Sequence, residues 1–217
     1  QMTDKTAVVI GVDIGTTSTK AVAFSTAGRV VAHHAVEYPL LTPTPAAAEQ
    51  DPEEIYRAVL TAIRHAVRKA GAAPGAVVGV SFSAAMHSVI AVDADGRPLT
   101  RSLTWADSRA TDWAERIKHD WGGLAIYQRT GTPIHPMSPL AKLVWLRREQ
   151  PEVFTRAARF IGIKEYVFFR LFKRYVVDYS IASATGLFNL SQLDWDTEAL
   201  KVAGITPTQL PEPVLGG

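Results

Sequence analysis

The residues best suited to chemistry lie in a short polar turn near the start of the chain. An apolar run, Val8 to Ile14, carries one carboxylate, Asp13, and a second apolar run begins at Ala21. Both runs are short and rich in β-branched residues, which predicts a β-hairpin. A glycine lets the backbone come close to a ligand, and backbone N–H groups, hydroxyls and an ammonium group can surround a phosphate. The predicted phosphate-binding residues are Thr16, Thr17, Ser18 and Lys20.

The carboxylate of Asp13 needs a partner, because an unpaired charge in a buried strand is costly. That partner is a metal ion, the waters of a metal ion, or a hydrogen-bond donor. The turn is not a nucleotide loop of the Gly-Lys-Ser/Thr type, since a strand follows where that motif requires a helix. The alternative is an ordinary hairpin with a threonine-rich turn, in which Asp13 is a local acceptor.

A second set of polar residues follows the apolar strand predicted over Val77 to Ser83. His87 could bond a sugar hydroxyl and Met86 could pack on a carbon face, because ligands bind near strand ends in open α/β sheets. A Met-His pair is also common as a satisfied feature of a core. His135 lies in a proline-pinned loop, GTPIHPMSP, where the simpler interpretation is a histidine facing solvent.

The stretch TWADSR offers three further candidates for ligand binding. Trp105 has a flat apolar face with an indole donor, and Arg109 has a fork suited to a carboxylate or phosphate. Asp107 could bind a ligand, or Asp107 or Ser108 could cap a helix that begins near Ala110.

The elements that must position these residues alternate between strands and helices. A third strand over Val30 to Tyr38 makes the start a β-meander. Helical spacing and end signals predict the first helix from Pro52 to Gly71. Further helices are predicted from Pro139, from Pro151, over Lys164 to Lys173 with its phenylalanines in the core, and over Thr197 to Ala203 with Asp196 as its cap. Additional strands are predicted over Val77 to Ser83 (buried), Val89 to Val92, Phe160 to Ile163 and Tyr175 to Asp178.

The composition is that of an ordinary globular protein. The chain has 217 residues, 47% hydrophobic and 20% charged, with a formal net charge of +2 and no cysteine. This balance gives no argument for a nucleic-acid or membrane partner, and there is no disulfide framework. The length fits one large domain, or one domain with a small lobe.

Taken together, these stretches resemble the FGGY family of sugar kinases. The resemblance rests on the motifs DIGTTSTK, AEQDPEEIY, AAMHS, TWADSRA, GTPIHPMSPLAKLVWL, IKEYVFFRL and DYSIASATGLFNL, in that order over nearly the whole chain. The loop PIHPMSP is most similar to the gluconokinase branch, with xylulokinases next.

The resemblance implies an α/β domain of the ribonuclease-H-like, actin-type ATPase fold, with a mixed sheet and flanking helices. It implies transfer of a phosphoryl group from ATP, with Mg²⁺, to a hydroxyl of a sugar acid such as gluconate. Asp13 would be the catalytic carboxylate beside the metal, acting through water, and the turn would hold the nucleotide phosphates. The residues expected at the sugar are Met86, His87, Trp105, Asp107, Arg109 and His135.

The resemblance also sets an expectation for the extent of the chain. Residues 1–217 match the N-terminal domain of such kinases. Their general-base aspartate is expected beyond Gly217, the last residue of this sequence, so this stretch alone is expected to be inactive. The alternatives are a xylulokinase or another pentulose or polyol kinase, a non-catalytic sugar-sensing module, and an actin-type polymerising protein. The expected partner is a small sugar or sugar acid, the expected location is the cytoplasm, and homodimerisation is considered.

Overall fold

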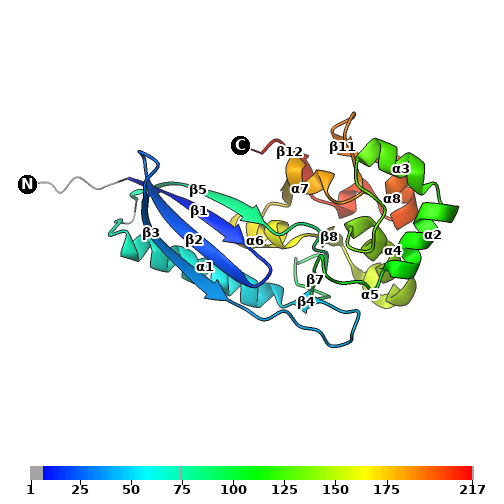
Figure 1. Ribbon diagram of the computed structural model, residues 1–217, viewed down its shortest axis with the longest axis horizontal. Coiled ribbons are helices and arrows are strands. Elements are labelled where there is room, and N and C mark those ends of the chain that lie inside the picture. The colour runs from blue at the N-terminus through cyan, green and yellow to red at the C-terminus, as the bar shows by residue number, and fades with distance from the viewer. Residues whose placement is uncertain (1–6, 74, 217) are drawn as a thin grey trace, which may run out of the picture. The chain divides into compact units, whose positions relative to one another are not determined.

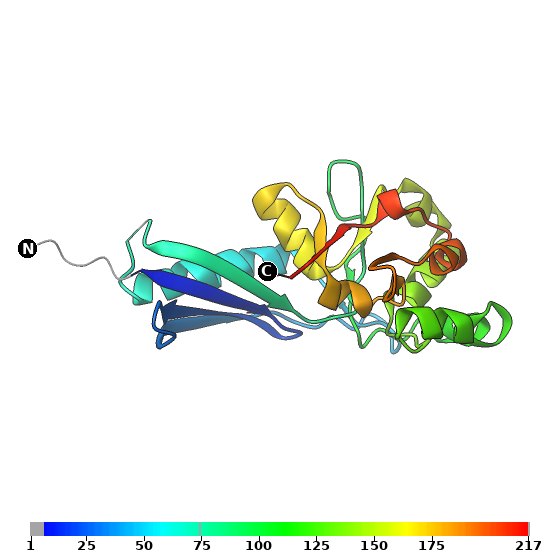
Figure 2. The same cartoon turned by 90° about the horizontal axis from the view of Figure 1, so that it is seen from above.

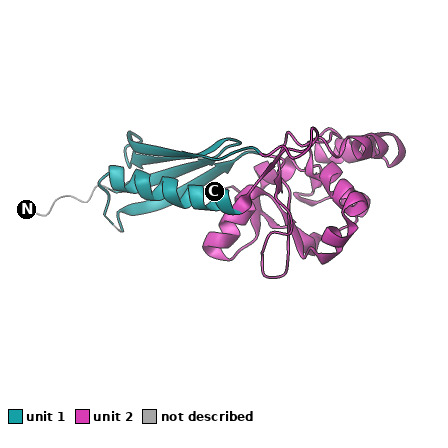
Figure 3. Cartoon of the chain, turned by 90° about the horizontal axis from the view of Figure 1, so that it is seen from below, with its two compact units in different colours: residues 1–40, 53–85 teal, residues 41–52, 86–217 magenta. Residues whose placement is uncertain are grey.

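The computed structural model describes residues 7–73 and 75–216, which divide into two compact units (Figure 3). Unit 1 combines the residues up to Leu40 with Glu53–Ala85. Unit 2 combines Leu41–Pro52 with the residues from Met86 onward. Both units contain strands and helices, so the predicted α/β class is confirmed.

One expectation from the sequence falls on the end of the chain. Gly217, beyond which the general-base aspartate is expected, lies outside the described residues. The position of that aspartate and the inactivity expected of residues 1–217 alone are therefore untested by the structure and stay predictions.

Unit 1 is built on a mixed four-stranded sheet in the order β3-β2-β1-β5 (Figure 1). The strands are β1 (Val8–Ile14), β2 (Ser18–Ser25), β3 (Val30–Glu37) and β5 (Val77–Ala84). The first three form the predicted antiparallel meander, and β5 runs parallel to β1. The alternation of side chains along β1 buries Val8, Ile10, Val12 and Ile14 on one face and leaves Asp13 on the other.

Helix α1 (Pro52–Lys69) covers the buried face of this sheet (Figures 1 and 2). Its buried residues recur at helical spacing and include Ile55, Val59, Ala62 and Ala66. The rings of His34 on β3 and His65 on α1 stack with centroids 4.4 Å apart. The opposite face of the sheet, which carries Asp13, is therefore left for other contacts.

Strand β5 is less buried than its apolar sequence predicts. Val78 is 63% exposed and Val80 is 43% exposed. Among the described strands β5 pairs with β1 alone, so its outer edge lacks a neighbour. An edge strand of this kind keeps apolar side chains partly in solvent.

Unit 2 contains short two-stranded sheets that tie distant segments together. Each sheet joins one strand to another far along the chain or at a hairpin: β4 (Glu49–Gln50) with β7 (Ser102–Leu103), β6 (Ile90–Val92) with β8 (Arg159–Ile161), β9 (Val176–Asp178) with β12 (Glu212–Val214), and β10 (Phe188–Asn189) with β11 (Asp194–Trp195). The strand predicted over Val89 to Val92 therefore pairs with β8 and does not continue the sheet of unit 1.

The helices of unit 2 surround a core centred on α4 (Pro139–Glu149), in which Leu140, Leu143, Val144 and Leu146 are buried. The others are α2 (Thr111–Asp120), α3 (Gly123–Thr130), α5 (Pro151–Arg156), α6 (Ile163–Phe172), α7 (Tyr179–Ser183) and α8 (Thr197–Ala203), with a 3₁₀ turn over Pro207–Gln209.

The predicted helices starting at Pro139, Pro151 and Thr197 are confirmed, and the Asp196 side chain caps α8 by accepting from Ala199 N–H at 2.9 Å. Helices α3 and α7 were not predicted, because α3 begins within the pair Gly122-Gly123 and α7 spans only five residues. The prediction that the phenylalanines of α6 are core is wrong for Phe172, which is 55% exposed. That helix buries Tyr166 and Val167 in their place.

Within the described residues, no helix is both long enough and apolar enough to cross a bilayer.

Candidate functional site

The predicted polar turn forms the tip of the β1–β2 hairpin and is closed by its own backbone. Gly15 N–H donates to Ser18 O at 2.9 Å. A side chain at Gly15 would place its Cβ 3.1 Å from that same oxygen, so glycine suits the close approach. Thr17 O accepts from Tyr38 N–H at 3.0 Å, which joins the turn to the end of β3.

Tyr38 supports the turn from inside unit 1. Its hydroxyl donates to Gly15 O at 2.8 Å and lies 3.1 Å from Thr19 Oγ1. Burial raises the pKa of Tyr38 to about 12, with a further rise from Asp13, against a lowering by its bond to Thr19. The phenol therefore keeps its proton and remains a donor. Sequence reasoning missed this residue, because it saw Tyr38 only as the end of a strand.

The hydroxyls of the turn divide into buried and accessible ones. Thr19 is fully buried against Tyr38, whereas Thr17 and Lys20 are exposed and Thr16 and Ser18 are half-buried. The four residues predicted to hold phosphate are thus reachable by a ligand. Their role itself stays a prediction.

Asp13 lies on the open face of the sheet beside Lys20 and the end of β5. Its Oδ1 accepts from the Ser83 hydroxyl at 2.7 Å. Asp13, Lys20 and Ser83 line a shallow pocket of about 260 Å³ that also includes Ser81 and Phe24. The expectation that the strand buries this carboxylate is wrong, because Asp13 is exposed, and the Ser83 hydroxyl is its hydrogen-bond donor.

His87 in unit 2 lies shortly after the end of β5 in the sequence and has a strained backbone. Its backbone has φ of 69°, which is unusual for a residue other than glycine. Its Nδ1 lies 2.9 Å from Ala184 O. Because a carbonyl only accepts, Nδ1 carries the proton and Nε2 of the neutral ring is left as an acceptor. Burial lowers the pKa of His87, the bond to Ala184 opposes this, and the charges of Lys142 and His135 lower it further.

Lys142 is a fully buried lysine on α4 that sequence reasoning missed. Its ammonium donates to Met137 O, and His87 O lies 3.4 Å from Nζ. Burial lowers the pKa of Lys142 to about 7, with Asp107 raising it and Arg109 lowering it. The sequence does contain a signal for this residue, because Lys142 is the one charged residue in the otherwise apolar run Leu140 to Leu146.

Asp107 and Arg109 form an internal ion pair. Asp107 is 1% exposed, and its Oδ2 accepts from Ala48 N–H at 3.0 Å and from Arg109 Nη2 at 2.6 Å. Arg109 Nη2 also donates to Glu49 Oε1 at 2.6 Å. Burial alone would lower the pKa of Arg109, but the bonds to Asp107 and Glu49 outweigh it and raise the pKa.

This arrangement bears on two expectations for this stretch: helix capping by Asp107 or Ser108, and ligand binding by Arg109. The alternative that Asp107 or Ser108 caps the next helix is wrong, because α2 begins after Ala110 and has no side-chain cap. The fork of Arg109 is engaged by two carboxylates and lies 4.5 Å from the centre of the Trp145 ring. Arg109 is thus tied to partners within the fold.

The remaining candidates, Met86, Trp105 and His135, are accessible. Met86 is 40% exposed, Trp105 is 49% exposed, and His135 is exposed in its loop. His135 Nδ1 accepts from Met137 N–H at 3.1 Å, so a neutral ring presents Nε2–H as a donor. Through Met137 and Lys142, unit 2 joins the loop of His135 to the backbone of His87.

Comparison with known proteins extends this picture to the whole chain. Residues 8–216 match the model of the FGGY family of carbohydrate kinases, N-terminal domain. The chain belongs to the FGGY family. The family resemblance expected from the sequence motifs is confirmed, and so is the actin-like ATPase fold.

Two curated relatives of this FGGY-family chain illustrate the range of similarity. A gluconokinase of Bacillus subtilis is 52% identical over 205 residues, covering 94% of this chain and 40% of the relative. A glycerol kinase of Thermococcus gammatolerans is 33% identical over 208 residues, covering 94% of this chain and 42% of the relative. The chain therefore spans about 40% of the length of the curated relatives it matches.

Two solved structures have nearly the same fold. A gluconate kinase of Lactobacillus acidophilus superposes with a TM-score of 0.92 at 40% identity, covering 96% of this chain and 42% of that one. A ligand-bound xylulose kinase of the same organism gives a TM-score of 0.91, also at 40% identity and with the same coverage. The fold and the identity to these two structures are therefore nearly the same for a gluconate kinase and a xylulose kinase.

Proposed function

We propose that this chain is the sugar-binding and phosphate-binding N-terminal part of an ATP-dependent gluconate kinase. The observation that carries the proposal is the step in identity, from 52% with a gluconokinase to 33% with a glycerol kinase over the same length of chain. Family membership supports phosphoryl transfer from ATP to a hydroxyl group. The activity, substrate and cytoplasmic location are proposed for the longer protein.

In this proposal the open face of the unit 1 sheet handles the phosphates. Thr16, Thr17 and Ser18 bond the phosphate oxygens, and Lys20 adds positive charge. Phosphoryl transfer depends mainly on positioning and charge stabilisation, which these groups supply without forming covalent bonds.

Asp13 fits a site for Mg²⁺ held through water. Mg²⁺ keeps several of its waters and is bound in proteins by one or two carboxylates together with substrate phosphates. Among residues 7–73 and 75–216, no three His, Cys, Asp or Glu side chains gather into a complete metal site. A single exposed carboxylate, oriented by Ser83 and facing a pocket beside Lys20, suits this mode of binding. When bound, the ion would neutralise charge on the phosphates.

Residues of unit 2 bind the sugar acid. His87 Nε2 accepts from a sugar hydroxyl, while Met86 and Trp105 offer apolar faces to its carbon chain. Arg109 is engaged by carboxylates of the fold. We therefore assign the hydrogen bond to the gluconate carboxylate to the Nε2–H of His135. Asp107 and Arg109 then act by holding the segment of Trp105 in place.

The proposal is tested by steady-state kinetics of the full-length kinase with gluconate, xylulose, ribulose and glycerol. We expect kcat/KM for gluconate to exceed that for each other substrate by at least about tenfold, which corresponds to about 1.4 kcal/mol. A preference for xylulose would favour the second candidate, a xylulose kinase, which the 0.91 TM-score supports. Turnover of none of these compounds would contradict both.

A variant of His135 tests the assigned contact with the carboxylate. His135→Gln should raise KM for gluconate and leave KM for ATP within about twofold, because only the sugar acid loses a partner. His119→Gln is the control, since His119 is exposed and bonds only Glu115 among the described residues. Equal KM values for gluconate in His135→Gln and the wild type would remove His135 from the site.

A further inference from the structure

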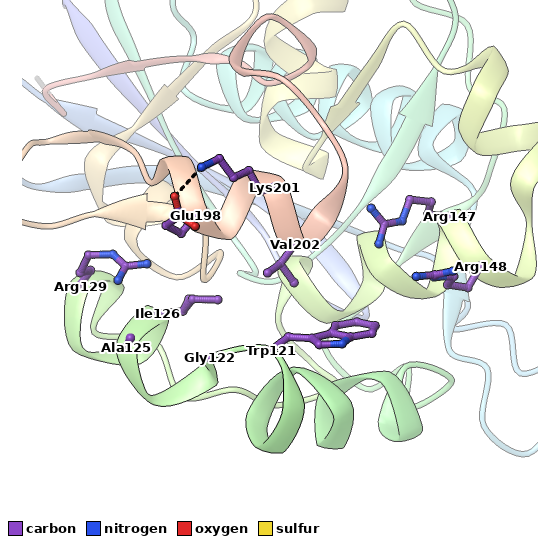
Figure 4. A pocket seen from close by; sticks show the side chains of 10 residues that line it. All are labelled: Trp121, Gly122, Ala125, Ile126, Arg129, Arg147, Arg148, Glu198, Lys201 and Val202. Atoms are coloured by element: carbon purple, nitrogen blue, oxygen red, sulfur yellow. Dashed lines mark hydrogen bonds and ion pairs between the residues drawn. The ribbon is translucent and has the colours of Figure 1, made fainter.

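A second pocket lies within unit 2, between α3, α4 and α8 (Figure 4). Its volume is about 470 Å³, which falls within the range of small-molecule sites. None of the residues assigned to phosphate or sugar binding above lines it. The lining residues are Trp121, Gly122, Ala125, Ile126, Arg129, Arg147, Arg148, Glu198, Lys201 and Val202.

Four of the five charged side chains around this pocket are cations, but two of the cations are neutralised locally. Arg129 makes a two-pronged bond to Asp196, with Nε to Oδ2 at 2.6 Å and Nη2 to Oδ1 at 3.0 Å. Lys201 pairs with Glu198 at 2.7 Å. The excess positive charge is therefore carried by Arg147 and Arg148.

Arg147 and Arg148 have no carboxylate partner in the part of the chain that the structure describes. Arg148 lies near the stacked rings of Trp113 and Trp121, with its Cζ 5.6 Å and 6.0 Å from their centroids. Arg147 packs over Gly204, where an added Cβ would come within 2.9 Å of Cζ. Burial and the charge of Arg148 both lower the pKa of Arg147. Two adjacent guanidinium groups repel each other, and one of these two is partly buried. An anion bound to both would therefore stabilise the pair.

Apolar side chains also line the pocket. They include Ala125, Ile126 and Val202, which we call its apolar floor, and Ile126 is 2% exposed. Figure 4 shows Arg147 and Arg148 on one side, with Val202 between them and Arg129. A ligand that satisfies both regions has an anionic end and a small carbon body.

We propose that this pocket binds a small organic phosphate, with the phosphate on Arg147 and Arg148 and the carbon part on Ile126 and Val202. A guanidinium pair matches the planar, two-pronged bonding of phosphate oxygens. The site is independent of the proposed kinase chemistry, and occupancy of one site does not require the other.

The test is a titration of the ¹⁵N-labelled chain with inorganic phosphate and with phenyl phosphate, at constant ionic strength set by chloride. We expect saturable shifts of the Trp121 indole N–H resonance, with phenyl phosphate binding at least threefold more tightly because it covers the apolar floor. Shifts that rise linearly with concentration, or that chloride reproduces, would overturn the proposal.

Variants of Arg147 and Arg148 test whether these two arginines bind the phosphate. Arg147→Gln and Arg148→Gln should each weaken phenyl phosphate binding at least tenfold. Arg156→Gln is the matched control for loss of charge, because Arg156 is exposed and does not line the pocket, and it should stay within twofold. Lys20→Gln separates this site from the hairpin turn and should leave the Trp121 response unchanged. Unaltered binding in both arginine variants would disprove the site, and Arg148→Gln still tests it if Arg147→Gln fails to fold.

Discussion

At the scale of single residues, Lys142 connects backbone segments that are far apart in the sequence. It is fully buried and links Met137 O with His87 O, so it joins two backbone segments that carry candidate sugar contacts. A lysine in this environment holds its neighbours through hydrogen bonds at a cost in desolvation. We infer that it is a positioning residue and does not contact the substrate.

Replacing Lys142 tests this role. If the longer protein is the proposed gluconate kinase, Lys142→Met should lower its kcat/KM for gluconate by at least about tenfold, mainly through KM, because His87 loses its support. In the chain itself, the pKa of His87 followed by NMR should rise, since a cation that lowers it is removed. Lys118→Met, an exposed change on α2, should alter neither quantity. An unchanged His87 pKa in Lys142→Met would contradict the coupling.

Glu165 gives a prediction about pH. It is 2% exposed, its Oε2 accepts from Gly162 N–H at 2.6 Å, and its Oε1 has no partner among the described residues. Burial raises its pKa to about 7, against the opposing bond from Gly162. The folded state thus holds this proton more tightly than the unfolded state. The contribution of Glu165 to stability should therefore be fully present below about pH 4.5 and be lost as the pH rises from about 4.5 to 7.

The measurement is urea unfolding of the wild type and Glu165→Gln at about pH 5 and pH 8. The wild type should lose on the order of 2–3 kcal/mol relative to Glu165→Gln over this interval, because the glutamine does not ionise. Stability curves that stay parallel across the two pH values would show that the carboxyl does not titrate there.

At the scale of elements, the hairpin depends on one phenol. Tyr38→Phe removes the bond to Gly15 O and the contact with Thr19 while keeping the ring. We expect a loss of about 1 kcal/mol in the free energy of unfolding, with faster amide exchange in the turn. Tyr127→Phe, at a position 43% exposed, is the control and should change stability by less than about 0.5 kcal/mol. Equal stability of both variants would contradict the support given by Tyr38.

The start of α8 gives a second prediction at this scale. Asp196 caps the helix, bonds Arg129 at two points and accepts from Asn189 Nδ2 at 3.1 Å. Asp196→Ala should therefore cost about 2–4 kcal/mol, as for a lost cap together with lost charge-assisted bonds to Arg129, whose side chain is 35% exposed. Glu198→Ala removes only an exposed pair with Lys201 and should cost less than about 1 kcal/mol. Thermal unfolding of the two variants distinguishes them.

Much of this local structure can be predicted from the sequence. The features that could not be predicted have physical causes. The hairpin, the start of α4 at Pro139 and the cap at Asp196 follow from signals within a few residues. The exposure of β5 does not, because an apolar strand reads the same at an edge and in the middle of a sheet. The engagement of Arg109 by Glu49 was equally hidden, since it joins residues 60 positions apart.

At the scale of the whole molecule, the family and fold are confirmed, while the assignment of individual ligand contacts stays a prediction. The motifs sufficed for the family because their order spans nearly the whole chain. They could not foresee Tyr38, Ser83 or Lys142, whose importance comes from partners brought close only by folding. Homodimerisation and a general-base aspartate beyond Gly217 likewise stay predictions.

The interleaving of the two units has a consequence for fragment design. The backbone passes from one unit to the other three times, after Leu40, after Pro52 and after Ala85. No single cut in the chain therefore releases either unit intact, and a truncation at residue 85 would strip β7 of its partner β4. Isolating unit 2 calls for a genetic rearrangement that rejoins Leu41–Pro52 to the later residues through a new linker.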